Sequence, residues 1–315
     1  MKKIAFICGI NGQDGSYLAK FLIHKGYEVW GSSRDVQGNS LSNLVSLGIQ
    51  TKVNLVSMWP EDFRSVFIGL NKAQPQEIYY LAGQSSVGLS FEQPAETIQS
   101  FVLGTLNILE ACRLLNYPVR IYHAGSSECF GDVNGQAADE ETPFHPRSPY
   151  AVAKASAYWL IDNYRDAYSL YACTGILFNH ESPLRPSRFV TKKIINAAKR
   201  IAEGSKEKLK LGRLDIARDW GWAPEYVEAM WLMLQQDKAM DFVVATGQTN
   251  TLEDFVSEAF KIHHLNWRDH VIQDKELYRP SEILVSKADP SKAERILGWK
   301  AKSKMSDVVR QMTLS

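Results

Sequence analysis

Tyr150 and Lys154 are spaced four residues apart directly after Pro149. Proline is favoured in the first turn of a helix, so the pattern predicts a helix over Pro149–Tyr168. Residues at i and i+4 lie on one face of a helix, and a nearby ammonium lowers the pKa of a phenol. Such a tyrosine can remove a hydroxyl proton while hydride leaves the same carbon. The pair therefore predicts hydroxyl–ketone redox chemistry, although the same spacing also arises by chance on amphipathic helices.

Ser126 and Glu128 follow a predicted strand over 119–124 and precede that helix. A serine hydroxyl at a strand end can hydrogen-bond the substrate oxygen that becomes a carbonyl. A carboxylate two residues further on can remove the acidified proton from the carbon next to that ketone. Glu128 could instead cap a helix or form a salt bridge. We predict that Ser126, Glu128, Tyr150 and Lys154 are the catalytic residues.

A glycine turn follows the apolar segment Ile4–Cys8 and leads into a helical pattern over 16–25. Its spacing is G-x-x-G-x-x-G. Glycines permit the tight turn and the close approach of phosphate, and the helix N-terminus supplies oriented N–H groups. The pattern predicts a dinucleotide-binding turn, whose contact residues are Gly9, Asn11, Gly12, Gln13, Asp14 and Gly15.

The residues after the second predicted strand, 28–30, bear on the choice of cofactor. Arg34 lies where an NAD enzyme usually has an acid for the ribose hydroxyls, and a guanidinium matches a 2′-phosphate. We therefore predict NADP. In the alternative, Arg34 is a solvated loop cation, Asp35 binds the ribose, and the cofactor is NAD.

Short β-branched runs alternate with helical patterns through the first 178 residues. Strands are predicted at 4–8, 28–30, 53–56, 77–81, 119–124 and 173–178, and helices at 16–25, 94–116 and 149–168. Such alternation predicts an α/β fold with a doubly wound parallel Rossmann sheet. We predict an NADP-binding domain over 1–178, with returns to the sheet near 214–246, and a smaller mixed α/β substrate-binding lobe over 179–213 and 247–315.

The bulk composition favours a small-molecule partner. The chain has 315 residues, and its 36 Lys+Arg against 35 Asp+Glu give a net charge of +1, which would not attract nucleic acid or anionic lipid. The four cysteines lack metal-ligand spacing, the N-terminal apolar run is too short for a signal peptide, and no stretch approaches the ~20 apolar residues of a membrane span. We expect a cytoplasmic protein without a metal, nucleic acid or membrane partner.

Several longer motifs carry a family resemblance. They include Gly-Gln-Asp-Gly-Ser-Tyr at 12–17, Leu-Ala-Gly-Gln-Ser at 81–85, Asn-His-Glu-Ser-Pro at 179–183 and Arg-Asp-Trp-Gly at 218–221. On these residues the chain resembles the GDP-mannose 4,6-dehydratase family of the short-chain dehydrogenase/reductase superfamily. The resemblance implies conversion of GDP-mannose to GDP-4-keto-6-deoxymannose by internal hydride transfer and loss of water, with NADP and a homodimer or homotetramer.

The resemblance also implies binding residues. Cofactor contacts are expected, besides the glycine turn, Arg34, Tyr150 and Lys154, from Leu81, Ala82, Gln84, Leu177, Asn179, His180 and Arg185. Substrate contacts are expected, besides Ser126, Glu128 and Tyr150, from Ser85, Asn179, Val190, Lys193, Arg218, Arg279 and Glu282. The cations among them suit a diphosphate. The chain departs from the family at Ser126, where threonine is usual, and at Met58-Trp59, where relatives commonly have Gly-Asp.

Three other functions are compatible with parts of the pattern. The substrate could be another GDP-linked sugar such as a heptose. A 4-epimerase or 4-reductase needs the hydroxyl, tyrosine and lysine but no base for C5, so Glu128 argues against it. A regulator that had lost catalysis would be expected to lack part of the active centre, and all four residues are present.

Overall fold

The computed structural model describes residues 2–38 and 40–314 as an α/β protein built on a parallel sheet. The sheet has seven strands in the order β10-β6-β5-β4-β1-β2-β3, and every pairing in it is parallel. The strands are β1 (Ile4–Cys8), β2 (Glu28–Ser33), β3 (Asn54–Ser57), β4 (Glu77–Tyr80), β5 (Arg120–Ala124), β6 (Tyr171–Leu177) and β10 (Phe242–Val244). The predicted doubly wound sheet is confirmed.

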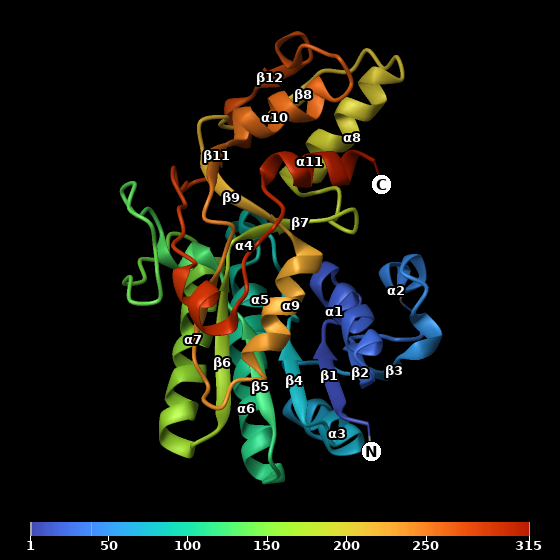
Figure 1. Ribbon diagram of the computed structural model, residues 1–315, viewed down its shortest axis with the longest axis vertical. Coiled ribbons are helices and arrows are strands. Elements are labelled where there is room, and N and C mark those ends of the chain that lie inside the picture. Colours follow the sequence, from blue (N-terminus) through green and yellow to red (C-terminus); the bar gives the residue numbers. More distant parts are fainter. Residues whose placement is uncertain (1, 39, 315) are drawn as a thin grey trace.

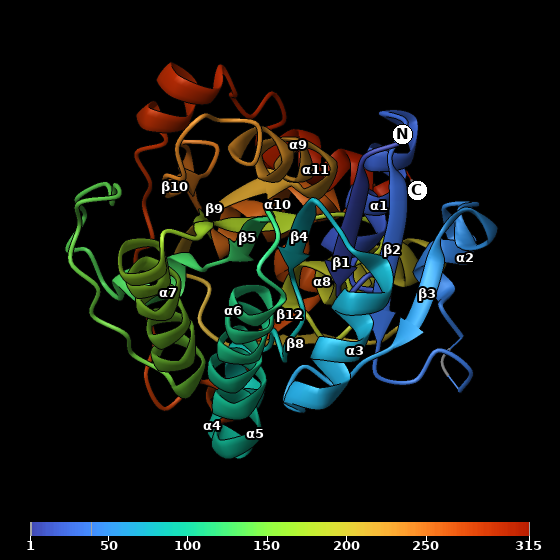
Figure 2. The same cartoon turned by 90° about the horizontal axis from the view of Figure 1, so that it is seen from below.

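Helices cover both faces of this sheet, as Figure 2 shows. On one face lie α1 (Gln13–His24) and α9 (Ala223–Met233), and on the other α3 (Phe63–Ala73), α6 (Gly104–Leu115) and α7 (Pro149–Tyr168). Because both faces are covered, the central strands are buried: every residue of β4 is buried, including Glu77, and so is β5 after Arg120.

Two element boundaries differ from the sequence prediction in a way that shapes the site. Helix α1 begins at Gln13, directly after its N-cap Gly12, three residues earlier than predicted. Strand β2 continues to Ser33 rather than ending at Trp30. As a result the glycine turn forms the helix N-terminus itself, and Arg34 follows the strand at once.

The helical run Pro94–Leu115 consists of α5 (Pro94–Ile98), a π-helical turn over Gln99–Leu103, and α6. By length and composition this run could cross a membrane, which corrects the expectation that no stretch of the chain is that apolar. Half of its apolar window is buried, and it packs against α3 and α7. A core helix of an α/β protein has the same composition.

A second layer lies over the carboxyl ends of the sheet strands, at the top of Figure 1. Strands β11 (Thr249–Thr251), β9 (Ala217–Trp222) and β7 (Asn179–Glu181) form one small sheet, and β12 (Val271–Gln273) pairs with β8 (Leu209–Leu211). Helices α8 (Val190–Ala202), α10 (Leu252–Lys261) and α11 (Met305–Thr313) enclose a separate hydrophobic cluster there. The remaining α-helices are α2 (Ser42–Ser46) and α4 (Val87–Glu92).

Candidate active site

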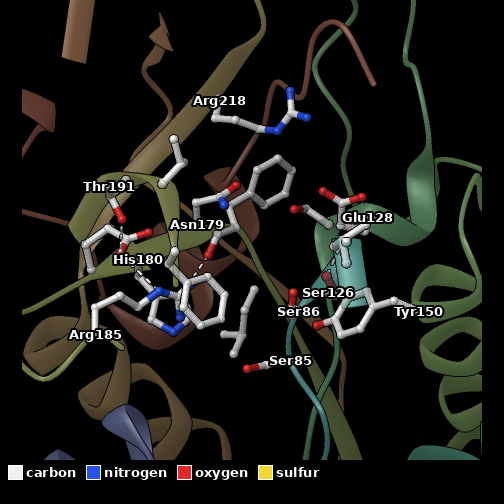
Figure 3. Close-up of a pocket in the computed structure, with 18 of the residues that line it drawn as sticks. Ser85, Ser86, Ser126, Glu128, Tyr150, Asn179, His180, Arg185, Thr191 and Arg218 are labelled. Atoms are coloured by element: carbon white, nitrogen blue, oxygen red, sulfur yellow. Dashed lines mark hydrogen bonds and ion pairs between the residues drawn. The ribbon is translucent and has the colours of Figure 1, made fainter. Parts of the chain in front are cut away.

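A cavity of about 420 Å³ lies between the strand ends of the large sheet and the upper layer. Its walls come from the segments after β4, β5 and β6 on one side and from β7, α8 and β9 on the other. Ligands in open α/β sheets bind at the carboxyl ends of the strands, where the strand order reverses. Figure 3 shows Ser126, Glu128 and Tyr150 on one side of this cavity, and Asn179 and His180 on the opposite side.

The start of α7 places Tyr150 and Lys154. The Ser148 side chain accepts a hydrogen bond from the Ala151 N–H at 3.1 Å, and Pro149 occupies the first turn, so local sequence defines this helix start. The Lys154 ammonium donates to the Ala124 carbonyl at 2.7 Å and lies 6.0 Å from the centre of the Tyr150 ring. Both side chains line the cavity, as predicted from their spacing.

Burial dominates the electrostatics of this pair. It raises the pKa of Tyr150, against a smaller lowering by the Ser126 hydroxyl. It also lowers the pKa of Lys154 to about 7. The expectation that the Lys154 ammonium lowers the pKa of Tyr150 is therefore not met in the free protein, because desolvation penalises both charged forms and the ammonium is hydrogen-bonded to a backbone carbonyl.

Glu128 lies in a short 3₁₀ turn, Ser127–Phe130, at the end of β5. The turn is capped by Ser126, whose hydroxyl accepts from the Glu128 N–H at 3.3 Å, so the Glu128 carboxylate is not used as the cap. Within residues 2–38 and 40–314 no ion pair within 4.0 Å engages this carboxylate, although its charge raises the pKa of Arg218 against the larger lowering by burial. The capping and salt-bridge alternatives therefore do not describe Glu128, which faces the cavity (Figure 3).

His180 forms a buried ion pair with Asp14 across two elements. Its Nε2 lies 2.9 Å from Asp14 Oδ2, and its Nδ1 lies 2.7 Å from the Phe178 carbonyl. Both partners accept hydrogen bonds, so both ring nitrogens carry protons. Burial alone would lower the pKa of His180, but the charge of Asp14 and these hydrogen bonds raise it, and the same pair lowers the pKa of Asp14 against its own burial.

We predict that this ion pair stabilises the fold in a pH-dependent manner. The raised pKa of His180 means that its stabilisation is complete below about pH 6.5 and is lost as the pH rises through the folded value. The lowered pKa of Asp14 makes its part complete above about pH 4. Asp14→Asn should therefore reduce the unfolding free energy, measured with urea, more at about pH 5.5 than at about pH 8.5.

The matched control is Asp215→Asn, which removes an exposed aspartate paired with Arg213. Because the pKa of Asp215 is also lowered, its loss should change stability equally at both pH values. If Asp14→Asn lowered the unfolding free energy equally at both pH values, its pairing with Asp14 would not keep His180 protonated.

Basic residues gather at the other end of the cavity. Arg218 on β9 is buried and donates to Glu282 at 3.1 Å, and Arg279 donates to the same carboxylate at 3.3 Å. Lys193 on α8 donates to the Lys210 carbonyl at 2.8 Å. Guanidinium and ammonium groups in this arrangement can bind a diphosphate through charge-assisted hydrogen bonds.

A second cavity of about 240 Å³ adjoins the first and shares Leu81 and Gly83 with it. It is lined by the glycine turn on one side and by the ends of β2 and β3 on the other. The turn leaves no room for side chains: a Cβ on Gly15 would lie 2.3 Å from the Gly9 carbonyl oxygen, and Gly9 has a φ of +81°. The bare backbone at a helix N-terminus fits a dinucleotide diphosphate.

The two cavities bring together most of the residues predicted from the sequence. Those that line the first are Asp14, Leu81, Ser85, Ser126, Glu128, Tyr150, Lys154, Leu177, Asn179, His180, Arg185, Val190, Lys193, Arg218 and Arg279. Those that line the second are Gly9, Asn11, Gly12, Arg34, Leu81 and Ala82.

Four predicted residues line neither cavity and instead support it. Gly15 packs against the backbone of Gly9, and the Glu282 carboxylate pairs with both Arg218 and Arg279. Gln13 donates to the His180 carbonyl at 3.1 Å and accepts from Ser182 at 2.8 Å, which ties the glycine turn to the segment after β6. Gln84 hydrogen-bonds both the N–H and the carbonyl of Ser86, so it holds the turn after β4.

Several lining residues were not among the predicted contacts, although Trp220 lies within the Arg-Asp-Trp-Gly motif. In the first cavity they include Ser86, Phe101, Arg188, Thr191, Trp220 and Leu277, and in the second Met58, Pro60 and Glu61. Phe101 in particular belongs to a helix whose pattern indicates only a core face. Arg188 carries a weak signal, as a cation between the predicted contacts Arg185 and Val190.

The fold and this site define a member of the short-chain dehydrogenase/reductase superfamily. A sequence model of GDP-mannose 4,6 dehydratase matches residues 6–312, and the chain belongs to that family. It is 47% identical to GDP-mannose 4,6 dehydratase 1 of Arabidopsis thaliana over 321 residues, which is 99% of this chain and 89% of the relative.

Solved structures show the same fold at lower identity. The Thermus thermophilus UDP-glucose 4-epimerase complex with NAD has a TM-score of 0.84 at 23% identity, covering 98% of each chain. RMD from Pseudomonas aeruginosa complexed with NADPH has a TM-score of 0.82 at 22% identity, covering 100% of this chain and 97% of its own.

Proposed function

We propose that this chain is a GDP-mannose 4,6-dehydratase, which converts GDP-mannose to GDP-4-keto-6-deoxymannose. The observation that carries the proposal is the convergence of Tyr150, Lys154, Ser126 and an unpaired Glu128 on one cavity. Its far end carries Arg218, Lys193 and Arg279, and the curated relatives of similar sequence are GDP-mannose 4,6-dehydratases.

In this proposal each catalytic residue has one task. A nicotinamide held beside Tyr150 by the glycine turn would supply the hydride acceptor and donor that the exchange between C4 and C6 requires. Tyr150 removes the C4 hydroxyl proton, Ser126 hydrogen-bonds the oxygen that becomes a ketone, and Lys154 supports the phenolate. Glu128 removes the C5 proton made acidic by that ketone, the C6 hydroxyl takes up a proton and leaves as water, and C5 is reprotonated when hydride returns to C6. Binding of the GDP half by the cationic end positions the sugar for both steps.

Incubation with a panel of nucleotide sugars tests the substrate. We expect a 4-keto-6-deoxy product from GDP-mannose, identified by NMR, and much slower turnover of UDP-glucose and dTDP-glucose. A GDP-linked heptose belongs in the panel. If it were turned over much faster than GDP-mannose, the reaction type would stand and the hexose assignment would fall.

We further propose NADP as the cofactor. Arg34 lines the second cavity, and its guanidinium lies 5.9 Å from the centre of the Trp59 ring. A 2′-phosphate in this cavity would pair with that guanidinium. Asp35 is outside that cavity, and its carboxylate accepts the N–H groups of Gln37 and Gly38 at 2.9 and 2.8 Å. A carboxylate occupied by its own loop is poorly placed to bind ribose hydroxyls, which favours NADP over NAD.

We therefore expect Arg34→Ala to weaken NADP⁺ binding roughly tenfold to a hundredfold, the value of one charge-assisted hydrogen bond, and to leave NAD⁺ binding unchanged. Quenching of intrinsic fluorescence on titration gives both dissociation constants. Arg200→Ala, at an exposed arginine paired with Glu207, is the control. Equal weakening of both dinucleotides would mean that Arg34 does not distinguish them.

We also propose that two copies of the chain associate through α5, α6 and α7. We propose that the protein is cytoplasmic, and that each chain is divided into the two domains predicted from the sequence. These adjacent helices expose large apolar side chains at Ile98, Leu103, Leu114, Val152, Trp159 and Tyr168. Exposed apolar surface on neighbouring helices is typical of protein–protein interfaces. Sedimentation equilibrium distinguishes a dimer or tetramer from a monomer.

A further inference from the structure

Phe101 lies where the helical run after β4 departs from α-helical geometry. It belongs to the π-helical turn Gln99–Leu103, is 2% exposed, and still contributes to the lining of the first cavity. Single π-helical turns inside α-helices frequently occur at functional sites, because the extra residue changes which side chains face inward.

The ring of Phe101 presents its face to Lys154. The Lys154 Nζ lies 3.9 Å from the ring centre, closer than to the Tyr150 ring at 6.0 Å. The hydrogen bond of this ammonium within the described chain goes to the Ala124 carbonyl. A desolvated ammonium over an aromatic face is attracted by the ring quadrupole, and this attraction favours the charged form.

Two further contacts fix the same ring. Phe101 and Tyr150 pack edge to face, with ring centres 5.4 Å apart and planes at 87°. Against Gly83 the ring lies so close that a Cβ there would be 2.1 Å from Phe101 Cε1. Gly83, with a φ of +136°, is one of the two residues, with Leu81, that line both cavities.

We propose that Phe101 is a positioning residue for the Tyr150–Lys154 pair: its face holds the Lys154 ammonium, and its perpendicular packing holds the Tyr150 ring. Nothing in the sequence motifs assigns this role. Its consequence for catalysis rests on the proposed function, whereas the ring–ammonium contact itself does not depend on which substrate is bound.

The other ionisable groups around Lys154 allow this contact to be isolated. Burial drives the pKa of His123 on β5 well below its ordinary value, and burial raises the pKa of Cys129 in the 3₁₀ turn after β5 to about 12. Neither changes charge near neutral pH, and Tyr150, with its raised pKa, also stays neutral. Asp14 on α1 remains ionised because its pKa is lowered. The pKa of Lys154, lowered by burial to about 7, falls in the measurable range.

The test uses the full chain without cofactor, with phenylalanine, mono-, di- or trifluorophenylalanine at position 101 and ¹³Cε-labelled lysine. The Lys154 signal is assigned by its loss in Lys154→Gln and followed by NMR against pH. Each fluorine weakens the ring quadrupole with little change in shape. We expect the titration midpoint to fall stepwise, by on the order of one pH unit over the series. The same series at Phe255, which contacts Trp220 in the upper layer, should leave the midpoint unchanged.

Leucine and tyrosine at position 101 extend the test to catalysis. Phe101→Leu should lower the midpoint of the Lys154 titration as far as trifluorination does, and should shift the pH profile of turnover in the same direction. Phe101→Tyr keeps an aromatic face, so both the midpoint and the pH profile should match those of the unchanged protein. A midpoint that does not follow the number of fluorines would overturn the proposal. If the fluorine series behaved as expected but GDP-mannose gave no product, the proposed function would fail and the Phe101–Lys154 interaction would stand.

Discussion

Glu128→Gln is expected to stop the reaction after its first oxidation. The amide keeps the size of the side chain but cannot accept the C5 proton, so turnover should fall about a hundredfold to ten-thousandfold, the usual contribution of a general base. Oxidation at C4 needs only Tyr150, Lys154 and Ser126, so it should continue. The 4-ketone and reduced nicotinamide should therefore accumulate together in a single turnover, visible as near-ultraviolet absorbance.

Glu92→Gln is the matched control for this variant, because Glu92 is an exposed glutamate at the end of α4 that lines neither cavity. It should turn over as the unchanged protein does. Full turnover by Glu128→Gln would remove Glu128 from its role and would return the epimerase and reductase alternatives to consideration.

Tyr150→Phe is expected to block the first oxidation at C4, the step that precedes proton removal by Glu128. The substitution removes one hydroxyl and retains the ring that packs against Phe101 at 5.4 Å, so the fold should be unaffected. Without a group to take the C4 hydroxyl proton, turnover should fall about a hundredfold to ten-thousandfold, and no reduced nicotinamide should accumulate.

Tyr168→Phe, at the exposed end of the same helix, controls for loss of a tyrosine hydroxyl from α7. Circular dichroism and thermal unfolding confirm that each variant is folded. Accumulation of reduced nicotinamide in Tyr150→Phe would show that another group removes the first proton, with Lys154 as the residue next to be replaced.

The parts of the site that local sequence determines were predictable. Ser148 and Pro149 define the start of α7, so the position of Tyr150 and Lys154 on one helix face follows from local sequence alone. The glycine turn is equally local, since it joins the buried strand β1 to helix α1, which begins at Gln13 directly after Gly12.

The rest of the site depends on long-range pairing. Strand β7 has three residues and pairs in parallel with β9, about forty positions later, which brings Asn179 and Arg218 to the same cavity. Elements this short carry no periodicity that would predict them. Residues such as Lys210 and Leu277 reach the cavity from segments that the sequence places far apart.

Phe101 could not be predicted for a different reason. The apolar pattern over 94–116 indicates one long amphipathic helix, and in regular α-helical geometry it would specify a single buried face. The π-helical turn shifts the phase of that pattern within the helix. Only the three-dimensional structure shows that the ring of Phe101 lies beside Lys154 and Tyr150.

The proposed reaction is an internal redox dehydration in which hydride removed from C4 returns to C6 of the same sugar. It is tested most directly by incubating the protein with GDP-mannose deuterated at C4 and locating the label in the product by NMR. We expect deuterium at C6 of a 4-keto-6-deoxy sugar. Loss of the label to solvent, or its retention at C4, would contradict it.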